Sequence, residues 1–175
     1  LGLLDVITKY AGSWILLQKY DENNLSLPSS SHKPVSVLDY NEAKIAVTEL
    51  RNKLSETNET MGLFGSEREH MFEGIVGNIY QTFGGEDLYP GIESKAAHLL
   101  YFIIKDHPFS DGNKRIGSFL FILFLAKNNY LLNASGERKF NDNALVALAL
   151  LVAESDPKQK EIMILLIINL IAGEL

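Results

Sequence analysis

Cysteine is absent from the 175 residues of this chain. Without cysteine the chain can form neither a disulfide framework nor a metal site built on thiolates. The histidines show no His-x-x-x-His spacing and no carboxylate at ligand spacing, so we expect no zinc site at His32 or His70. A chain without disulfides is typical of a reducing compartment, and we expect a cytoplasmic protein.

Positive charge is in short supply. Lys and Arg number 16 against 22 Asp and Glu, which gives a formal net charge of -6. Proteins that bind nucleic acids usually present a basic surface, so nucleic acid is not an expected partner of this domain.

Long hydrophobic runs are also missing. The strongly apolar uncharged stretches, residues 116–126 and 162–173, are shorter than the roughly 18 residues of a membrane span, so we expect no membrane partner. The start lacks the basic region and small-residue cleavage site of a signal peptide. It begins with Leu rather than Met, which leaves open a further domain before Leu1.

Strand-like alternation is lacking over any useful length, whereas helical spacing of apolar residues recurs throughout. We expect an all-α helical bundle. The expected helices cover about residues 2–20, 39–57, 66–80, 92–105, 113–129, 141–153 and 157–172. Paired glycines and a proline in residues 81–91 predict an extended loop or small β-hairpin. Residues 21–35 are rich in Asn, Ser and Pro, so we divide the chain into an N-terminal helix and linker (1–35) and a main domain (36–175).

Two apolar helices flank the polar loop at residues 107–115. The C-terminal helix and the first helix also carry apolar surfaces that need a surface to pack against. The segment FLFILFLA is apolar on all sides and is typical of a buried central helix. The C-terminal helix either covers the core or forms a homodimer interface. Tyr10, Trp14 and Leu17 form a stripe that belongs to a core or to a partner surface.

The stretch HPFSDGNKR (residues 107–115) lies between two apolar helices. Asn113, Lys114 and Arg115 fall in the first turn of the second helix, where unpaired N–H groups and the helix dipole attract anions. Gly112 lets a phosphate approach the backbone. The two cations add charge, and arginine grips phosphate oxygens with a planar fork.

Asp111 and His107 add two further functions to this loop. A carboxylate beside a phosphate site is suited to hold Mg²⁺, which would then bridge to phosphate oxygens. Histidine is suited to act as a general base near neutral pH. The alternative is purely structural: Asp111 would cap the helix, Lys114 and Arg115 would be solvated, and residues 107–108 would form a packed turn.

The same residues carry a family resemblance. HPFSDGNKR is similar to the signature His-x-Phe-x-Asp/Glu-Gly/Ala-Asn-Gly/Lys-Arg of the Fic/Doc family, and QTFGGEDLYPGIESKAAHLLYFIIKDHPF resembles its death-on-curing (Doc) branch. The resemblance covers about residues 75–128. It implies an all-α Fic-type bundle with a hairpin flap, and a bacterial toxin–antitoxin setting.

The resemblance also implies roles for individual residues. His107 would deprotonate the target hydroxyl, Asp111 would bind Mg²⁺, and Phe109 would point into the core. Gly112, Asn113 and Lys114 would form the anion hole, and Arg115 would contact the phosphates of ATP. The flap that aligns the target segment would consist of Tyr80, Gln81, Thr82, Phe83, Gly84 and Gly85.

Three positions bear on which group is transferred. Lys114 resembles the Doc branch, in which the γ-phosphoryl group is transferred, whereas AMP-transferring members usually have Gly there. Gly112 resembles the AMP-transferring members, where the type Doc toxin has Ala. Ser118 stands where those members carry a second Arg. AMP and phosphoryl transfer both stay open on this comparison.

An internal inhibitory helix is not expected. The segment EHMFEG (residues 69–74) has Glu where the inhibitory motif needs Ser or Thr, and Ser118 removes the usual arginine partner of that motif. Regulation is therefore expected from a separate, antitoxin-like inhibitor protein or from chain beyond this sequence. His98 is interpreted as a histidine at the edge of the core, and Glu86 and Asp87 as solvated loop charges.

The sequence therefore predicts an ATP- and Mg²⁺-dependent enzyme that transfers AMP or a phosphoryl group to a Ser, Thr or Tyr hydroxyl of a target protein. The alternative is a non-catalytic Fic-fold module that acts as a toxin-like or partner-binding domain. The intact His107 and Asp111 favour the enzyme, because a binding module has no need of a base.

Overall fold

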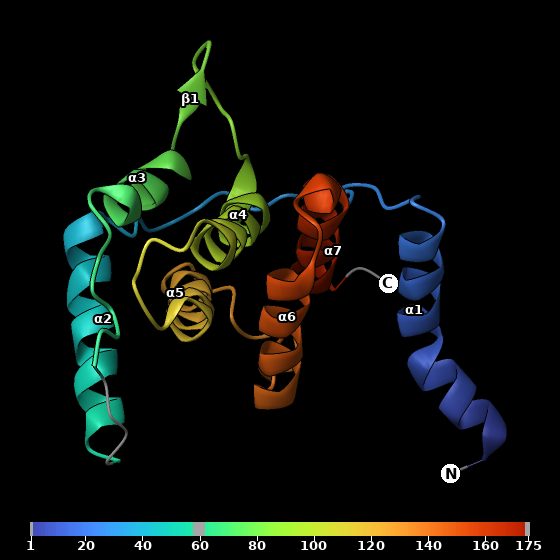
Figure 1. Cartoon of the computed structure of the whole chain (residues 1–175). Helices are drawn as coiled ribbons and strands as arrows, with labels where there is room; N and C mark the ends of the chain where they lie inside the picture. The colour runs from blue at the N-terminus through green and yellow to red at the C-terminus, as the bar shows by residue number, and fades with distance from the viewer. Residues whose placement is uncertain (1, 58–61, 174–175) are drawn as a thin grey trace.

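The computed structural model describes residues 2–57 and 62–173. These residues form an all-α bundle with one small hairpin, as the sequence predicts (Figure 1). The elements in chain order are α1 (Leu3–Asp21), α2 (Tyr40–Ser55), α3 (Met71–Asn78), β1 (Thr82–Phe83), β2 (Glu86–Asp87), α4 (Gly91–Asp106), α5 (Asn113–Lys127), α6 (Asp142–Glu154), the 3-10 helix η1 (Pro157–Gln159) and α7 (Lys160–Ala172).

The centre of the molecule is the pair of helices α4 and α5. They approach closely at Gly117, where a Cβ would lie 3.1 Å from Ile104 and 3.2 Å from Ile103. Helices α2 and α3 pack on one side of this pair, and α6 and α7 pack on the other (Figure 1). The two helices that carry the HPFSDGNKR loop between them are therefore the most enclosed helices of the bundle.

Side-chain caps begin several of the described helical segments. Asp39 accepts a hydrogen bond from the backbone N–H of Glu42 at 2.9 Å and starts α2. Asp156 accepts from Lys158 N–H at 2.9 Å, although it caps the 3-10 turn that precedes α7 rather than α7 itself. Gly173 ends α7 with a positive φ of 65°.

One expected helix is much shorter than predicted. Of residues 66–80 only Met71–Asn78 is helical. Gly65 and Glu69 adopt positive φ values of 72° and 50°, which a right-handed helix cannot continue through. Residues 63–68 instead run beside the loop at residues 108–111, and their backbone groups bond to it.

The expected hairpin is confirmed at residues 82–87. Thr82 pairs with Asp87, and Phe83 pairs with Glu86. Gly84 and Gly85 make the turn, with φ values of 62° and 86°. Two consecutive positive φ values give the tight turn whose twist suits a two-residue hairpin.

The segment that the sequence marks as a linker is held against the bundle. Asn169 on α7 donates a hydrogen bond to the carbonyl of Ser26 at 3.0 Å. Asn128 accepts hydrogen bonds from the backbone N–H groups of Val35 and Ser36 at 2.9 and 3.1 Å. Residues 26–36 are thus fixed at both ends, although they form neither helix nor strand.

The two terminal helices differ in burial. Helix α7 buries Met163, Ile167 and Ile171 in the core. It therefore covers the core, which was one of the two alternatives that the sequence left open for this helix. Helix α1 lies at the edge of the molecule beyond α7 (Figure 1), and its Tyr10 and Trp14 are 56% and 48% exposed. The expectation of a core stripe on α1 is therefore wrong, and the partner interpretation stays open.

Within the described residues, no helix combines the length and the apolar character that a membrane crossing requires.

Candidate active site

The HPFSDGNKR loop is bounded by two residues in the left-handed region. His107 follows the last turn of α4 with φ 51° and ψ 59°, and Gly112 precedes α5 with φ 91°. A histidine pays a conformational cost for this backbone geometry, whereas a glycine does not. The strain at His107 therefore persists only because the surrounding loop is fixed.

Asn113 fixes the loop from inside. Its side-chain amide donates to the carbonyl of Phe109 at 2.8 Å, and its side-chain oxygen accepts from the N–H of Phe109 at 3.0 Å. Asn113 is 9% exposed and Phe109 is 1% exposed, and the Phe109 ring packs on Phe72 with centroids 4.7 Å apart. The asparagine thus has a structural task that the family resemblance did not assign to it.

A neighbouring segment fixes the loop from outside. Residues 65–68 exchange three backbone hydrogen bonds with it, from Gly65 to Asp111 (3.1 Å), from Ser110 to Ser66 (2.9 Å) and from Arg68 to Pro108 (2.8 Å). Sequence reasoning missed this segment because it was assigned to a helix. Gly62 and Gly65 were the available signal, since both interrupt the helical pattern before α3.

Gly112 is required by its surroundings. A Cβ at this position would lie well inside the van der Waals distance of the Phe64 ring, and φ is 91°. Both the ring and the backbone conformation therefore exclude alanine without a local shift.

The first turn of α5 has no side-chain cap. Gly112 has no side chain that could cap the helix, so the first N–H groups are left for an external acceptor. Lys114 is exposed beside this turn. Arg115 is 46% exposed and lies over the Phe64 ring, with its guanidinium carbon 4.7 Å from the ring centroid. Ser118 donates to the carbonyl of Lys114 at 2.7 Å, so its hydroxyl is engaged within the helix.

Asp111 is the carboxylate that the sequence assigns to Mg²⁺. It is 56% exposed, and its Oδ2 lies 3.6 Å from a guanidinium nitrogen of Arg115. The described residues contain no cluster of three His, Asp or Glu that could cage a metal. A single accessible carboxylate next to a phosphate site nevertheless fits Mg²⁺, which is commonly held by one or two carboxylates together with substrate phosphates.

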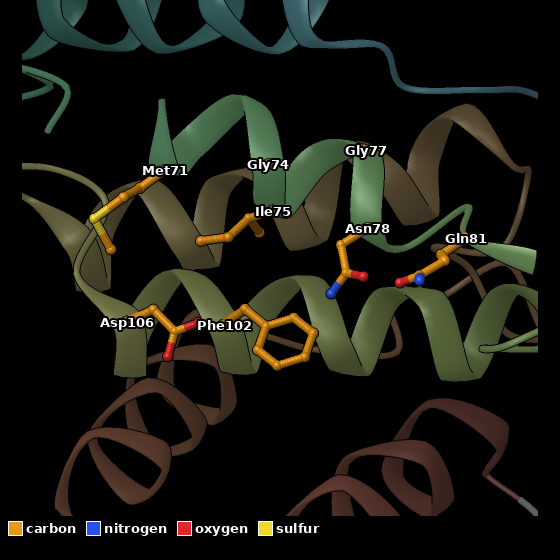
Figure 2. A pocket seen from close by; sticks show the side chains of 8 residues that line it. All are labelled: Met71, Gly74, Ile75, Gly77, Asn78, Gln81, Phe102 and Asp106. Atoms are coloured by element: carbon orange, nitrogen blue, oxygen red, sulfur yellow. The ribbon is translucent and has the colours of Figure 1, made fainter. Parts of the chain in front are cut away.

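A cavity of about 550 Å³ opens between α3, α4 and the start of the hairpin (Figure 2). The amide side chains of Asn78 and Gln81 line one end, and Asp106 lines the other. Burial raises the pKa of Asp106, while coulombic interactions with Lys160 and His107 oppose that change. Asp106 directly precedes His107 in the sequence, but His107 itself does not line this cavity.

The expected flap residues occupy different environments. Tyr80 is half-buried, and its hydroxyl accepts from the N–H of Leu38 at 2.8 Å, which gives it a structural contact. Gln81 lines the cavity. The hairpin residues are exposed, and Phe83 is 84% exposed, so Thr82, Phe83, Gly84 and Gly85 are accessible to a partner.

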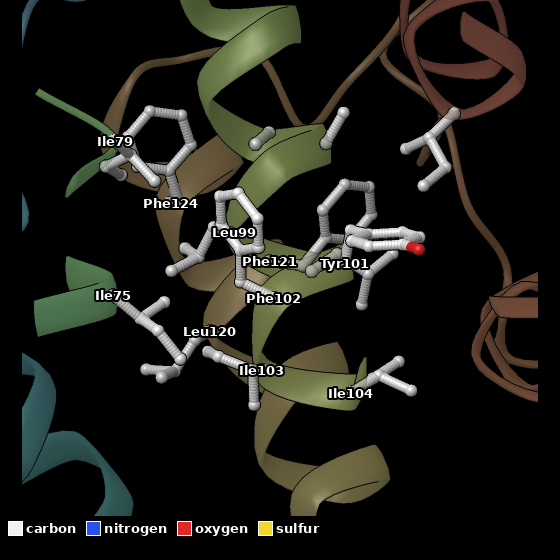
Figure 3. Packing of buried hydrophobic residues seen from close by; sticks show 14 of the residues in the cluster. Ile75, Ile79, Leu99, Tyr101, Phe102, Ile103, Ile104, Leu120, Phe121 and Phe124 are labelled. Atoms are coloured by element: carbon white, nitrogen blue, oxygen red, sulfur yellow. The ribbon is translucent and has the colours of Figure 1, made fainter. Parts of the chain in front are cut away.

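The packing behind the loop is dense (Figure 3). Leu99 and Ile103 of α4 and Leu120, Phe121 and Phe124 of α5 are fully buried. Because close-packed interiors resist displacement, this core fixes the end of α4 and the start of α5 relative to one another. The two ends of the loop are therefore held at a fixed distance from each other by the packing of α4 on α5.

His98 lies on α4, away from the loop. Its ring stacks on Tyr89 with centroids 3.8 Å apart, and its Nδ1 is 2.7 Å from the carbonyl of Ser94. Burial lowers the pKa of His98 to about 4, against the opposing effect of the Ser94 hydrogen bond, and the charge of Lys160 lowers it further. This is a histidine kept neutral by packing, which agrees with its interpretation as an edge-of-core residue.

His32 has a carboxylate partner that sequence spacing could not reveal. Its Nδ1 lies 2.6 Å from a carboxylate oxygen of Glu93, 61 positions away, and Glu93 is 3% exposed. Burial raises the pKa of Glu93, but hydrogen bonds from His32 and Tyr130 and from backbone N–H groups outweigh it, so the pKa is lowered. The pair fastens the linker segment to the start of α4.

The described residues thus place an uncapped helix start, an adjoining histidine and a carboxylate in one fixed loop of an all-α bundle, and the start of a helix is suited to hold an anion such as phosphate. The Fic/DOC family model matches residues 38–125, just over half of the chain. The chain therefore belongs to the Fic/DOC family, which is generally linked to the transfer of nucleotide or phosphate groups onto proteins. No curated protein and no solved structure matches the chain significantly.

Proposed function

We propose that this chain transfers a phosphate-containing group from ATP to a Ser, Thr or Tyr hydroxyl of a target protein, with His107 as the general base. The observation that carries the proposal is the loop itself. It holds His107, Asp111 and the uncapped start of α5 within nine residues, and Asn113 and residues 65–68 fix its backbone from both sides. Such preorganisation serves catalysis more than simple binding.

His107 would accept the proton of the target hydroxyl while that oxygen forms a bond to phosphorus. The bond from phosphorus to the leaving oxygen breaks, and the leaving group is ADP for phosphoryl transfer or pyrophosphate for AMP transfer. Lys114, Arg115 and the first N–H groups of α5 would stabilise the charge that builds on the phosphate oxygens. The exposed hairpin would align the target segment through its backbone groups.

Asp111 would hold Mg²⁺, and the metal supplies neutralisation of phosphate charge when it is bound. Arg115 lies beside Asp111 and partly balances its charge. Donor phosphates would offer Arg115 a second acceptor at the same place, because its planar fork suits phosphate oxygens.

Of the two transferred groups, the phosphoryl group is favoured. Gly112 was the one feature in the loop that favoured AMP, but the Phe64 ring and the positive φ already account for glycine at this position. Lys114 and Ser118 then remain, and both favour the Doc-like reaction. We place the reaction in the cytoplasm, in keeping with a chain free of cysteine, and we propose that a separate protein inhibits it.

Product analysis after incubation with Mg-ATP tests the proposal. Chromatography of the nucleotides should show ADP, formed by slow transfer to water or to the chain itself, and its formation should require Mg²⁺. His107→Ala and Asp111→Asn should each abolish the product, whereas His70→Ala should not, because His70 is 95% exposed and remote from the loop in sequence.

Formation of AMP and pyrophosphate with the same dependence on His107 would assign AMP transfer instead. Nucleotide turnover that persists in His107→Ala would refute the role of His107 as the base. ATP binding without any turnover would favour the partner-binding module.

A further inference from the structure

Helix α1 presents its apolar side chains to solvent rather than to the protein. Leu3, Ile7, Tyr10, Trp14 and Leu17, here called the α1 stripe, are spaced four, three, four and three residues apart. This seven-residue spacing places them along one line of the helix. Their exposed fractions range from 42% to 77%.

The contact between α1 and the rest of the molecule is on another face. Leu16 is the buried residue of α1, and Gly12 and Tyr20, four positions either side of it, are partly buried. A surface helix normally turns its apolar side chains toward the core. In α1 the longest apolar stripe points away from it, so the stripe is available to a partner.

A complementary hollow lies on the opposite side of the bundle. It has a volume of about 470 Å³, with Phe119 and Ile122 of α5 between Leu54 of α2 and Val146 and Leu150 of α6. We call it the α5 groove. Val146 and Leu150 are 59% and 50% exposed, so the described part of the chain leaves this apolar surface uncovered. Helix α5 forms the floor of this groove, and α2 and α6 form its two walls. A groove of this kind accepts an amphipathic helix.

The α5 groove and the α1 stripe each have charged residues at one end, and these charges are opposite in sign. Lys114 and Arg115 line the α5 groove at the N-terminal end of α5. Asp21 lies four residues after Leu17 and therefore continues the α1 stripe at its C-terminal end. A helix laid antiparallel to α5 would place Asp21 and the negative end of the α1 dipole at the two cations.

The α1 stripe cannot occupy the groove of its own chain. Asn169 holds Ser26 against α7, only four residues after the C-cap residue Glu22. Helices α6 and α7 stand between α1 and the groove (Figure 1). A second copy of the chain is free of this tether.

We propose that the α1 stripe of one chain docks in the α5 groove of a second copy, with Asp21 facing Lys114 and Arg115. The exchange is reciprocal, so each dimer contains the contact twice and covers both apolar surfaces. Pairing of two α1 stripes is disfavoured by comparison. If the two α1 helices run parallel, Asp21 of one chain faces Asp21 of the other. Whether they run parallel or antiparallel, the α5 groove of each chain stays exposed. The association does not require the transfer reaction, but Asp21 and donor phosphates would compete for Lys114 and Arg115.

Cysteine cross-linking tests the contact directly, because the chain has no cysteine of its own. A Leu17→Cys chain is mixed with a Val146→Cys chain under mild oxidation, and the products are separated on a non-reducing gel and identified by intact mass. We expect the mixed dimer to form faster than either homodimer. A Lys9→Cys chain is the matched control, because Lys9 lies on the other face of α1, and it should form little mixed dimer.

Two outcomes of this experiment would overturn the proposal. A homodimer of Leu17→Cys as the main product would show that the stripes pair with each other. A mixed dimer that forms no faster with Leu17→Cys than with Lys9→Cys would show that the stripe has no preference for the groove.

Trp14 gives an independent readout, because it is the single tryptophan of the chain and belongs to the stripe. Its emission should shift to shorter wavelength as the protein concentration rises, and Val146→Asp should remove the shift. Asp21→Lys should raise the dissociation constant by about three- to tenfold at low salt. An emission that is independent of concentration would refute the association, and an unchanged dissociation constant in Asp21→Lys would refute the orientation.

Discussion

At the scale of single residues, the candidate site depends on groups that perform no chemistry. Asn113 closes the loop on itself, and Gly112 lets α5 begin beneath Phe64. His107 can keep its left-handed backbone only while these contacts hold. The motif therefore contains residues that fix the conformation of the loop and residues that would act in the reaction.

Gly112→Ala should destabilise the protein and abolish nucleotide turnover. Gly136→Ala is the matched control, because Gly136 also has a positive φ, 78°, but an added Cβ there meets no atom within 4 Å. The control should lose about 1 kcal/mol for the backbone alone. Gly112→Ala should lose about 1–3 kcal/mol more because of Phe64. Urea unfolding measures both, and equal losses would contradict the packing argument.

Asn113→Ala should remove two hydrogen bonds at once and leave the buried N–H and carbonyl of Phe109 without partners. We expect a loss of about 2 kcal/mol or more in the free energy of unfolding. Asn52→Ala, at an exposed position of α2, should change it little. If Asn113→Ala matches this control in unfolding by urea, Asn113 does not hold the loop.

At the scale of elements, the helices were largely predictable and the segments between them were not. Apolar periodicity and caps such as Asp39 depend on residues close in sequence, so α2, α4, α5 and α7 fall near their expected positions. The bonds between residues 65–68 and the loop join positions at least 40 apart. Local patterns carry no information on such pairings, and residues 66–70 were assigned to a helix for that reason.

The linker gives a second example and a prediction. His32→Ala should destabilise the protein by about 1 kcal/mol near neutral pH, because the buried Glu93 loses a hydrogen bond that holds its pKa down. The pKa of Glu93 is lower in the folded chain than its unfolded value of 4.5, so the ionised carboxylate stabilises the fold at pH values above 4.5. That contribution disappears as the pH falls through the folded pKa. The difference between His32→Ala and wild type should therefore shrink in acid.

Urea unfolding at several pH values measures this difference. His70→Ala is the matched control, because His70 is 95% exposed and lies 3.7 Å from the exposed Glu73. A loss in His32→Ala no larger than in His70→Ala would mean that the pair does not fasten the linker.

Helix α4 should make stability depend on pH through His98. Its folded pKa of about 4 lies below the ordinary 6.5, so the unfolded chain binds the proton first as the pH falls. This contribution to stability is complete above pH 6.5 and decreases down to about pH 4. His98→Gln should lose less stability than wild type over that interval in thermal unfolding. Parallel pH profiles of the two proteins would contradict the burial of a neutral histidine.

At the scale of the whole molecule, the sequence predicted the fold class, and its motif pointed to the family that the family model shows. For α1 the sequence left two alternatives, a stripe in a core or against a partner, and the exposure of Tyr10 and Trp14 excludes the core. Periodicity shows that a helix has an apolar side, but it does not show whether that side faces its own chain or another one. The roles assigned to His107, Asp111 and the flap remain predictions.

The most direct test of the account is the intact mass of the purified chain after incubation with Mg-ATP, beside His107→Ala. The account predicts a gain of about 80 Da, one phosphoryl group on a hydroxyl of the chain, in wild type alone. A gain of about 329 Da would keep His107 as the base but replace the phosphoryl group by AMP. The same gain in both proteins would contradict the central claim, because a modification that does not need His107 cannot come from this site.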